Sequence, residues 1–155
     1  MDFRITGLPA ARFAHLFHLA DAELAAHRAL RRTCTEKPGY PCRVSLEDAE
    51  PGEAVLLVNY EHLPVDSPYR ASHAIYVREL ATRPFDAVNI LPEALATRLL
   101  SLRAIDAQGL IVDADIAEGE AIEPLIRRLL GNEQVAYVHA HFARRGCFAA
   151  RIDRT

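Results

Sequence analysis

The sequence predicts an α+β fold with a largely antiparallel sheet, a few short packing helices and a C-terminal β-hairpin. Short runs with the two-residue alternation of strands dominate the chain, and the helical runs are fewer and do not alternate regularly with the strands. The chain has 155 residues, of which 50% are hydrophobic, so it has enough apolar material for one sizeable core. We therefore expect a single globular domain spanning residues 1–155.

The expected strands are short, rich in β-branched and aromatic residues, and bounded by turn-forming residues. In chain order they are Phe3–Leu8, Arg28–Cys34, Ala54–His62, His73–Glu79, Leu99–Ile105 and Leu110–Ile116, followed by the terminal hairpin. Their succession favours a substantially antiparallel sheet.

The expected helices are Pro9–Leu19, Asp21–Ala29, Pro92–Arg98 and Glu120–Leu130. The last has the clearest pattern, because its apolar residues recur on one helical face and its acidic and basic residues suit the two ends of the helix dipole. Pro124 fits only in the first turn, so regular helix is expected to start close to it.

The C-terminal hairpin consists of Tyr137–Phe142 and Cys147–Ile152, joined by a three-residue turn in which Gly146 adopts a positive φ. Alternation places His139 and His141 on one face. The remaining pairs follow from the turn: His139 opposite Arg151, His141 opposite Ala149, Phe142 opposite Phe148, and Cys147 on the histidine face.

Two connections, residues 36–43 and 64–73, combine prolines with aromatic, basic or nucleophilic side chains. Because proline limits backbone freedom, such loops position side chains at a small entropic cost.

Five ordered sequence blocks resemble a known family. They are Glu36–Arg43, Leu56–Tyr60, Ser67–Arg70, Ser101–Ala104 and the hairpin from His139 to Arg151. Together they resemble, over nearly the whole chain, the uncharacterised bacterial family called domain of unknown function 1203. No reaction, cofactor or catalytic residue is established for that family, so the resemblance implies none for this chain.

The net charge of -3 and the pI near 6.2 argue against a broad phosphate-binding surface, so we expect no nucleic-acid partner. We expect no membrane partner either, because the amino terminus lacks a signal pattern and no apolar run approaches the roughly 20 residues that span a bilayer. The expected location is the cytoplasm. Cys34, Cys42 and Cys147 are odd in number and lack a paired short spacing, which argues against a disulfide framework and a zinc ribbon.

Histidines on one strand face suggest a zinc or iron site, which Cys147, His62 or a carboxylate would complete. Two histidines alone are too few, however, and Arg151 opposite His139 would repel a cation. We therefore assign no metal ligand and expect folding to require no metal. In the alternative interpretation, the histidines form local hydrogen bonds on a half-exposed sheet face.

A second hypothesis is nucleophilic catalysis. Cys42 or Cys147 would be the nucleophile, activated by neighbouring arginines, and His139 or His141 would transfer the proton. In the alternative interpretation, each cysteine is a small buried apolar residue.

A third hypothesis is a small-anion pocket, because guanidinium groups bind carboxylate or phosphate and tyrosines add stacking and a hydroxyl. The candidate residues are Tyr40, Arg43, Tyr60, Tyr69, Arg70, Arg103 and Arg151. This hypothesis requires the two proline loops to converge, so that Arg43 and Arg70 share one ligand with Tyr40 or Tyr69.

The favoured function is binding of a small anionic molecule by these loop residues beside the histidine strand. One alternative is a non-catalytic protein-interaction domain, and another is a metal-dependent or cysteine–histidine hydrolase. A deep pocket that joins the loops favours ligand binding, whereas a flat aromatic patch favours a protein partner. The sequence assigns no cofactor and no oligomeric state.

Overall fold

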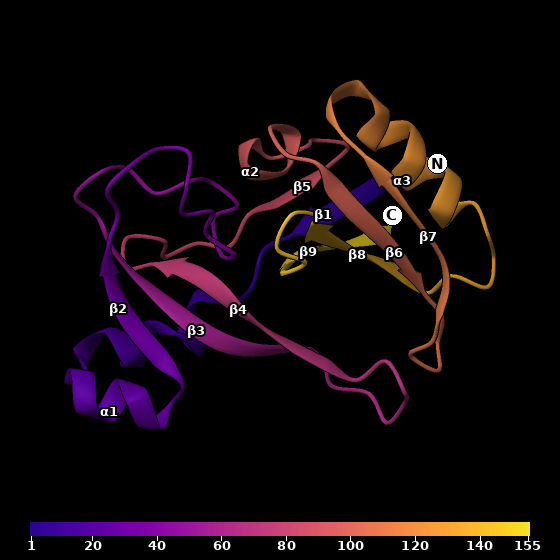
Figure 1. Ribbon diagram of the computed structural model, residues 1–155. Coiled ribbons are helices and arrows are strands. Elements are labelled where there is room, and N and C mark those ends of the chain that lie inside the picture. Colours follow the sequence, from indigo (N-terminus) through magenta and orange to yellow (C-terminus); the bar gives the residue numbers. More distant parts are fainter.

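The computed structural model describes residues 1–155 and contains two sheets. The larger sheet has the strand order β5-β1-β9-β8-β6-β7, the smaller has the order β2-β3-β4, and all strand pairs are antiparallel. Figure 1 shows the β3–β4 hairpin running below the larger sheet toward the turn between β6 and β7. The predicted α+β class is confirmed.

The observed strands follow the predicted runs closely. They are β1 (Phe3–Thr6), β2 (Ala29–Thr33), β3 (Ala54–Leu63), β4 (Ala71–Arg78), β5 (Asp86–Val88), β6 (Leu100–Ile105), β7 (Ile111–Ala117), β8 (Tyr137–Phe142) and β9 (Phe148–Arg154). Only β5 is absent from the prediction, because three residues are too few to show an alternation.

The helices are short. They are α1 (Asp21–Ala26), α2 (Glu93–Ala96) and α3 (Ile122–Leu130), with 3-10 turns η1 (Ala10–Arg12), η2 (Ala14–His18) and η3 (Gly119–Ala121). The helix predicted from residue 9 to residue 19 is therefore two 3-10 turns, whereas α3 buries its predicted apolar face and has Pro124 in its first turn. None of these helices has the length and apolar character needed to cross a bilayer.

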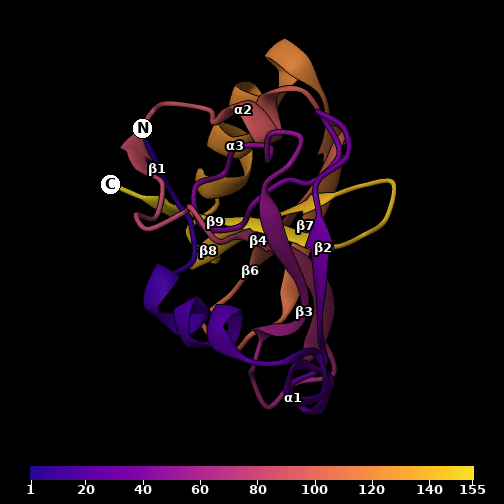
Figure 2. The same cartoon turned by 90° about the vertical axis from the view of Figure 1, so that its left-hand side faces the viewer.

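The two sheets pack against different helices, which gives two hydrophobic cores. The larger core lies between the six-stranded sheet and α3, and the smaller lies between the three-stranded sheet, η1, η2 and α1. Figure 2 shows α1 at the opposite end of the molecule from α2 and α3. Phe148 on β9 belongs to the smaller core, so the six-stranded sheet contributes to both.

The C-terminal hairpin confirms part of the predicted register. His139 lies opposite Arg151, and Gly146 has a φ of 79°. The predicted pairing of His141 with Ala149 is wrong, because a β-bulge places His141 opposite Phe148.

The turn itself explains the error. The N–H of Phe142 donates to the carbonyl of Cys147 at 2.9 Å, so the loop has four residues rather than three. A one-residue shift moves a side chain to the other face of a sheet. Phe148 therefore lies beside the histidines, and Cys147 packs in the larger core with Phe142, which corrects the prediction for both residues.

Arg43 stabilises the bulged segment. Its side chain is buried, with 2% of the residue exposed, and its Nε–H donates to the carbonyl of Phe148 at 2.7 Å. A second nitrogen donates to the carbonyl of Pro41, and a third donates to Cys147 Sγ at 3.0 Å. The guanidinium also lies 4.8 Å from the ring centre of Phe142. Arg43 thus joins the first proline loop to the end of the C-terminal hairpin.

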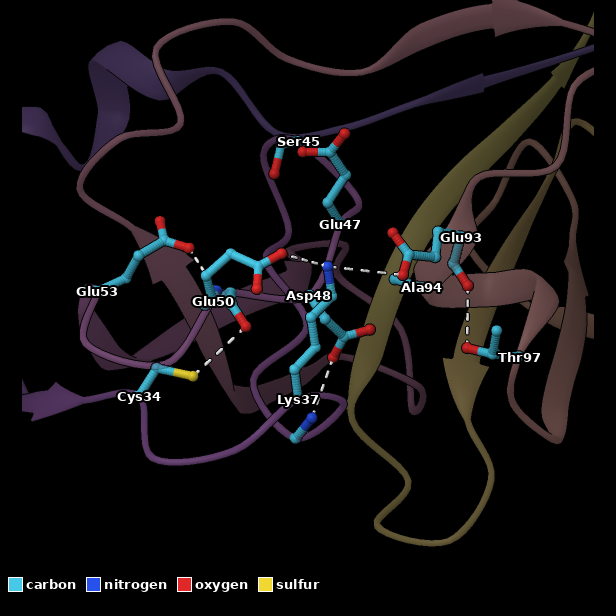
Figure 3. Close-up of polar contacts among 12 residues, drawn as sticks. Cys34, Lys37, Ser45, Glu47, Asp48, Glu50, Glu53, Glu93, Ala94 and Thr97 are labelled. Carbon is cyan, nitrogen blue, oxygen red and sulfur yellow. Dashed lines mark hydrogen bonds and ion pairs between the residues drawn. The ribbon is translucent and has the colours of Figure 1, made fainter.

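Ion pairs attach the first loop and the residues that follow it to neighbouring elements. Asp48 is 2% exposed and accepts hydrogen bonds from Arg98, which follows α2, at 2.6 and 2.8 Å. Figure 3 shows Lys37 between Glu50 and Glu93, at 2.6 and 3.8 Å respectively. These contacts attach the loop and the residues after it to α2 and to Arg98.

The second proline loop is docked at the other end of the β3–β4 hairpin. The hydroxyl of Ser67 donates to the carbonyl of Gly109, in the turn between β6 and β7, at 2.9 Å. Gly109 has a φ of 80°, and a Cβ at this position would lie 2.5 Å from a methyl carbon of Val65. The side chain of Val65 therefore packs directly on the backbone of Gly109, and this contact holds the hairpin against the six-stranded sheet.

We expect Arg43→Met to lower the free energy of unfolding by about 3 kcal/mol, because it leaves buried carbonyls without their donor. Urea denaturation followed by circular dichroism measures the change. The control is Arg4→Met, which removes an exposed arginine paired with Asp86 and should leave the urea midpoint nearly unchanged. Equal midpoints for the two variants would contradict the structural role of Arg43.

Candidate functional site

Three histidines from two strands meet between the sheets. His62 is on β3, and His139 and His141 are on β8. One ring nitrogen of each histidine lies within 4.8 Å of the other two. The three residues are 9%, 4% and 1% exposed, respectively. We refer to them below as the histidine cluster.

Aromatic rings surround the histidine cluster. The ring of Phe148 stacks on His62, with 5.5 Å between ring centres and an angle of 7° between the planes. His62 presents an edge-to-face contact to His141 at 4.8 Å, and Tyr137 lies 5.0 Å from His139. These contacts restrict the rotamers of the rings and keep most water away from them.

Hydrogen bonding differs among the three rings. Nδ1 of His141 lies 2.9 Å from the carbonyl oxygen of Gly146. In the neutral ring Nδ1–H is therefore the donor, and the lone pair of Nε2 is available. Nδ1 of His62 and Nδ1 of His139 are buried and have no hydrogen-bond partner. Each such unsatisfied group costs about 1–3 kcal/mol, so these two atoms need an explanation.

Burial keeps the histidine cluster neutral. It lowers the pKa of His62 to about 4, of His139 to about 2 and of His141 to about 3. The positive charge of nearby Arg103 lowers each of these pKa values further. At pH 7 all three imidazoles therefore carry a nitrogen lone pair, which is the state that binds a metal ion.

His62 completes a set of three possible metal ligands, which the sequence alone did not establish. The expectation that no metal binds was based on the two histidines of β8, and β3 now adds His62 to them. Neutral imidazoles suit zinc, copper, iron and nickel ions. No cysteine and no carboxylate belongs to the group, so the histidine cluster offers three protein ligands.

The two candidate nucleophiles lie outside the histidine cluster. Cys42 is 1% exposed, and its Sγ accepts hydrogen bonds from the backbone N–H groups of Val44 and Arg78. Cys147 is 8% exposed and contacts Arg43. The structure pairs neither thiol with a histidine, so it gives both cysteines a packing role.

The two proline loops do not converge, and this part of the anion-pocket prediction is wrong. Arg43 is buried beside β4, where its backbone N–H donates to Tyr76. Arg70 is exposed, pairs with Glu61 at 2.6 Å and precedes the other end of β4. Since a strand rises about 3.3 Å per residue, the two positions are roughly 20 Å apart along β4.

The candidate tyrosines are also separated. Tyr40, in the first loop, packs its ring against that of Tyr76 on β4 with the planes tilted by 55°, and its hydroxyl shares a hydrogen bond with Thr35. Tyr69 is 42% exposed in the second loop. Of the three, Tyr60 lies nearest to the histidine cluster, because its ring centre is 5.8 Å from that of Phe148.

Two candidate arginines flank the histidine cluster. Arg103 on β6 and Arg151 on β9 lie on either side of His139 in the register of the sheet. Arg151 pairs with Asp153 at 2.8 Å and lies over the ring of Tyr137. The Arg103 side chain makes one hydrogen bond, from Nε to the hydroxyl oxygen of Ser101 at 3.3 Å, and burial lowers its pKa.

The two most distinct surface hollows lie elsewhere. One has a volume of about 410 Å³ between η1, η2 and the end of β4, and the other has about 200 Å³ beside Arg12 and Tyr60. Neither is lined by the histidine cluster or by the proline loops. The histidine cluster is therefore not part of either hollow, and a ligand bound by its ring nitrogens would be an ion or a small group.

We expect the metal-free protein to lose stability as the pH falls from 7 to 5. The unfolded chain protonates these histidines near pH 6.5, but the folded chain does so only at pH 4 or below. The unfolded state therefore binds more protons in this range, and each histidine lowers the free energy of unfolding by up to about 1.4 kcal/mol per pH unit. Their full contribution is present above pH 6.5.

Urea denaturation at several pH values with a chelator measures this dependence. His139→Gln should make it shallower, whereas His18→Ala, which removes an exposed histidine, should leave the slope unchanged. A wild-type stability that does not vary between pH 7 and pH 5 would contradict the lowered pKa values of the cluster.

The comparisons with known proteins agree with the resemblance seen in the sequence. No curated protein and no solved structure matches the chain. Residues 39–154 match the family model described as protein of unknown function, DUF1203. The matched range includes the whole histidine cluster and about three quarters of the chain, and the chain therefore belongs to the DUF1203 family.

Proposed function

We propose that the protein binds a divalent transition-metal ion, with zinc as the best fit, through His62, His139 and His141. The observation that carries this proposal is the convergence of three buried, neutral imidazoles whose ring nitrogens lie within 4.8 Å of one another. This proposal replaces the expectation of no metal that the sequence alone supported.

The unsatisfied nitrogens support a metal over a purely structural cluster. Two buried Nδ1 atoms, on His62 and His139, have no hydrogen-bond partner, and a metal ion would satisfy such lone pairs. His141 has the complementary feature, because its Nδ1–H donates to a backbone carbonyl. Metal-binding histidines usually donate their other ring N–H in this way.

The geometry requires a small contraction when the ion binds. Zinc–nitrogen bonds are about 2.0–2.1 Å long, so tetrahedral coordination places ligand nitrogens about 3.4 Å apart. The ring nitrogens, which lie up to 4.8 Å apart, must therefore move closer together when the ion binds.

Three protein ligands leave a coordination position for water or substrate, which is the arrangement of catalytic rather than structural zinc sites. A metal ion held by the three histidines would lower the pKa of bound water to about 7 and would so supply hydroxide at neutral pH. The reaction class that fits is therefore metal-assisted hydrolysis or hydration. The cysteine–histidine alternative has no comparable support, because both candidate thiols lie outside the cluster.

We also retain a cytoplasmic location as a proposal. Its support is the state of the three cysteines, which are all free and buried. Proteins of oxidising compartments more often use their cysteines in disulfides.

The test is zinc binding by protein made without a histidine tag. We expect one equivalent by elemental analysis after loading, and a dissociation constant from competition with a chromophoric chelator. His62→Phe should weaken zinc binding about 100-fold or more, because it removes a ligand and retains the stacking on Phe148. His18→Ala is the matched control and should bind zinc as the wild type does.

Chelation should leave the protein folded, because neither hydrophobic core includes a member of the histidine cluster. Zinc should then raise the melting temperature of the wild type but not of His62→Phe. Substoichiometric zinc in the loaded wild type, or equal affinities for wild type and His62→Phe, would refute the metal site.

A further inference from the structure

Arg103 lies on the same sheet face as the histidine cluster. In the register of β6 with β8, Arg103 is opposite His139 and Ser101 is opposite His141. Directly opposed residues of antiparallel strands have Cβ atoms about 4.5–5.5 Å apart. The guanidinium and the hydroxyl therefore border the two histidines of β8 along one side.

Arg103 differs from the neighbouring arginines in having no acidic partner. Arg151, on the other side of His139, pairs with Asp153 at 2.8 Å. Arg70 pairs with Glu61 at 2.6 Å. No carboxylate lies within 4.0 Å of Arg103, and its only side-chain hydrogen bond uses Nε, which leaves the two terminal nitrogens available.

The charges of the site then need a counter-ion. A divalent ion held by three neutral imidazoles carries two positive charges, and half-buried Arg103 adds a third nearby. Two positive charges that lie close together repel strongly where water is largely excluded. A ligand with negative charge between the ion and Arg103 removes this repulsion.

We infer that Arg103 and Ser101 bind a small oxyanion, a carboxylate or phosphate group, at the open coordination position of the metal. This inference rests on the metal site proposed above and names its ligand class. The terminal nitrogens of Arg103 form the planar fork that matches two oxygens of such a group. The hydroxyl of Ser101, which accepts from Arg103, directs its own hydrogen toward a third acceptor.

The experiment uses the full chain loaded with Co²⁺, whose visible absorption reports its coordination. Inorganic phosphate and acetate are titrated separately, and at least one should change the spectrum saturably. Tighter binding of acetate assigns a carboxylate ligand, and tighter binding of phosphate assigns a phosphate ligand. Absence of any spectral change with both anions would overturn the inference.

The decisive variant is Arg103→Met, which should have opposite effects on the two ligands. Anion binding should weaken about 10-fold or more because the fork is lost. Co²⁺ binding in anion-free buffer should become tighter because a repelling charge is lost. A variant that merely disturbs the fold would weaken both, and that result would overturn the inference.

Two further variants complete the design. Arg103→Lys keeps the charge without the fork, so it should bind the anion with intermediate affinity. Arg4→Met, an exposed arginine already paired with Asp86, should bind both ligands as the wild type does. Failure of Co²⁺ to bind the wild type would refute the metal site and this inference together. Normal Co²⁺ binding with anion affinity unchanged in Arg103→Met would refute this inference alone.

Discussion

The buried guanidinium of Arg43 is the interaction on which the arrangement of the site depends. It joins the first proline loop to the C-terminal hairpin through the carbonyls of Pro41 and Phe148 and the sulfur of Cys147. A carbonyl displaced from the regular ladder by a bulge needs another donor, and Arg43 supplies it. The bulge in turn places Phe148 against His62, where it fixes the orientation of that ring. Arg43 therefore acts on the histidine cluster through Phe148, without contact to a ligand.

The histidine cluster exists because a hairpin of the smaller sheet crosses a face of the larger one. His62 on β3 meets the histidines of β8, and contacts at both ends of the β3–β4 hairpin hold β3 in this position. The segment that follows the first loop supplies one attachment through the Asp48–Arg98 ion pair near α2. Ser67 supplies the other by its hydrogen bond to Gly109. The two proline loops that the sequence suggested as ligand-binding segments thus position the strand that carries His62.

Local patterns predicted most of the fold and part of the site. Alternation correctly placed His139 and His141 on one face, because a strand determines this relation within three residues. The error at Phe148 arose from a bulge stabilised by Arg43, which is 105 positions away in the sequence. His62 was recognised only as a candidate additional ligand, since no local signal relates β3 to β8. Sequence spacing also does not distinguish the two arginines beside His139. Arg151 is paired with Asp153, whereas Arg103 has no carboxylate partner.

The charge distribution of the site would make the proposed metal and anion binding interdependent. Three neutral imidazoles attract a divalent ion through their lone pairs alone, while Arg103 opposes it. A bound oxyanion offsets this opposition, and the metal in turn strengthens the attraction for the oxyanion. Thermodynamic linkage requires that the two effects be equal in free energy. If both proposals hold, the site should bind each ligand most tightly when the other is present, and removing the anion should weaken retention of the metal. Because Arg103 lies opposite His139 on the neighbouring strand, the pairing of β6 with β8 is the structural source of this coupling.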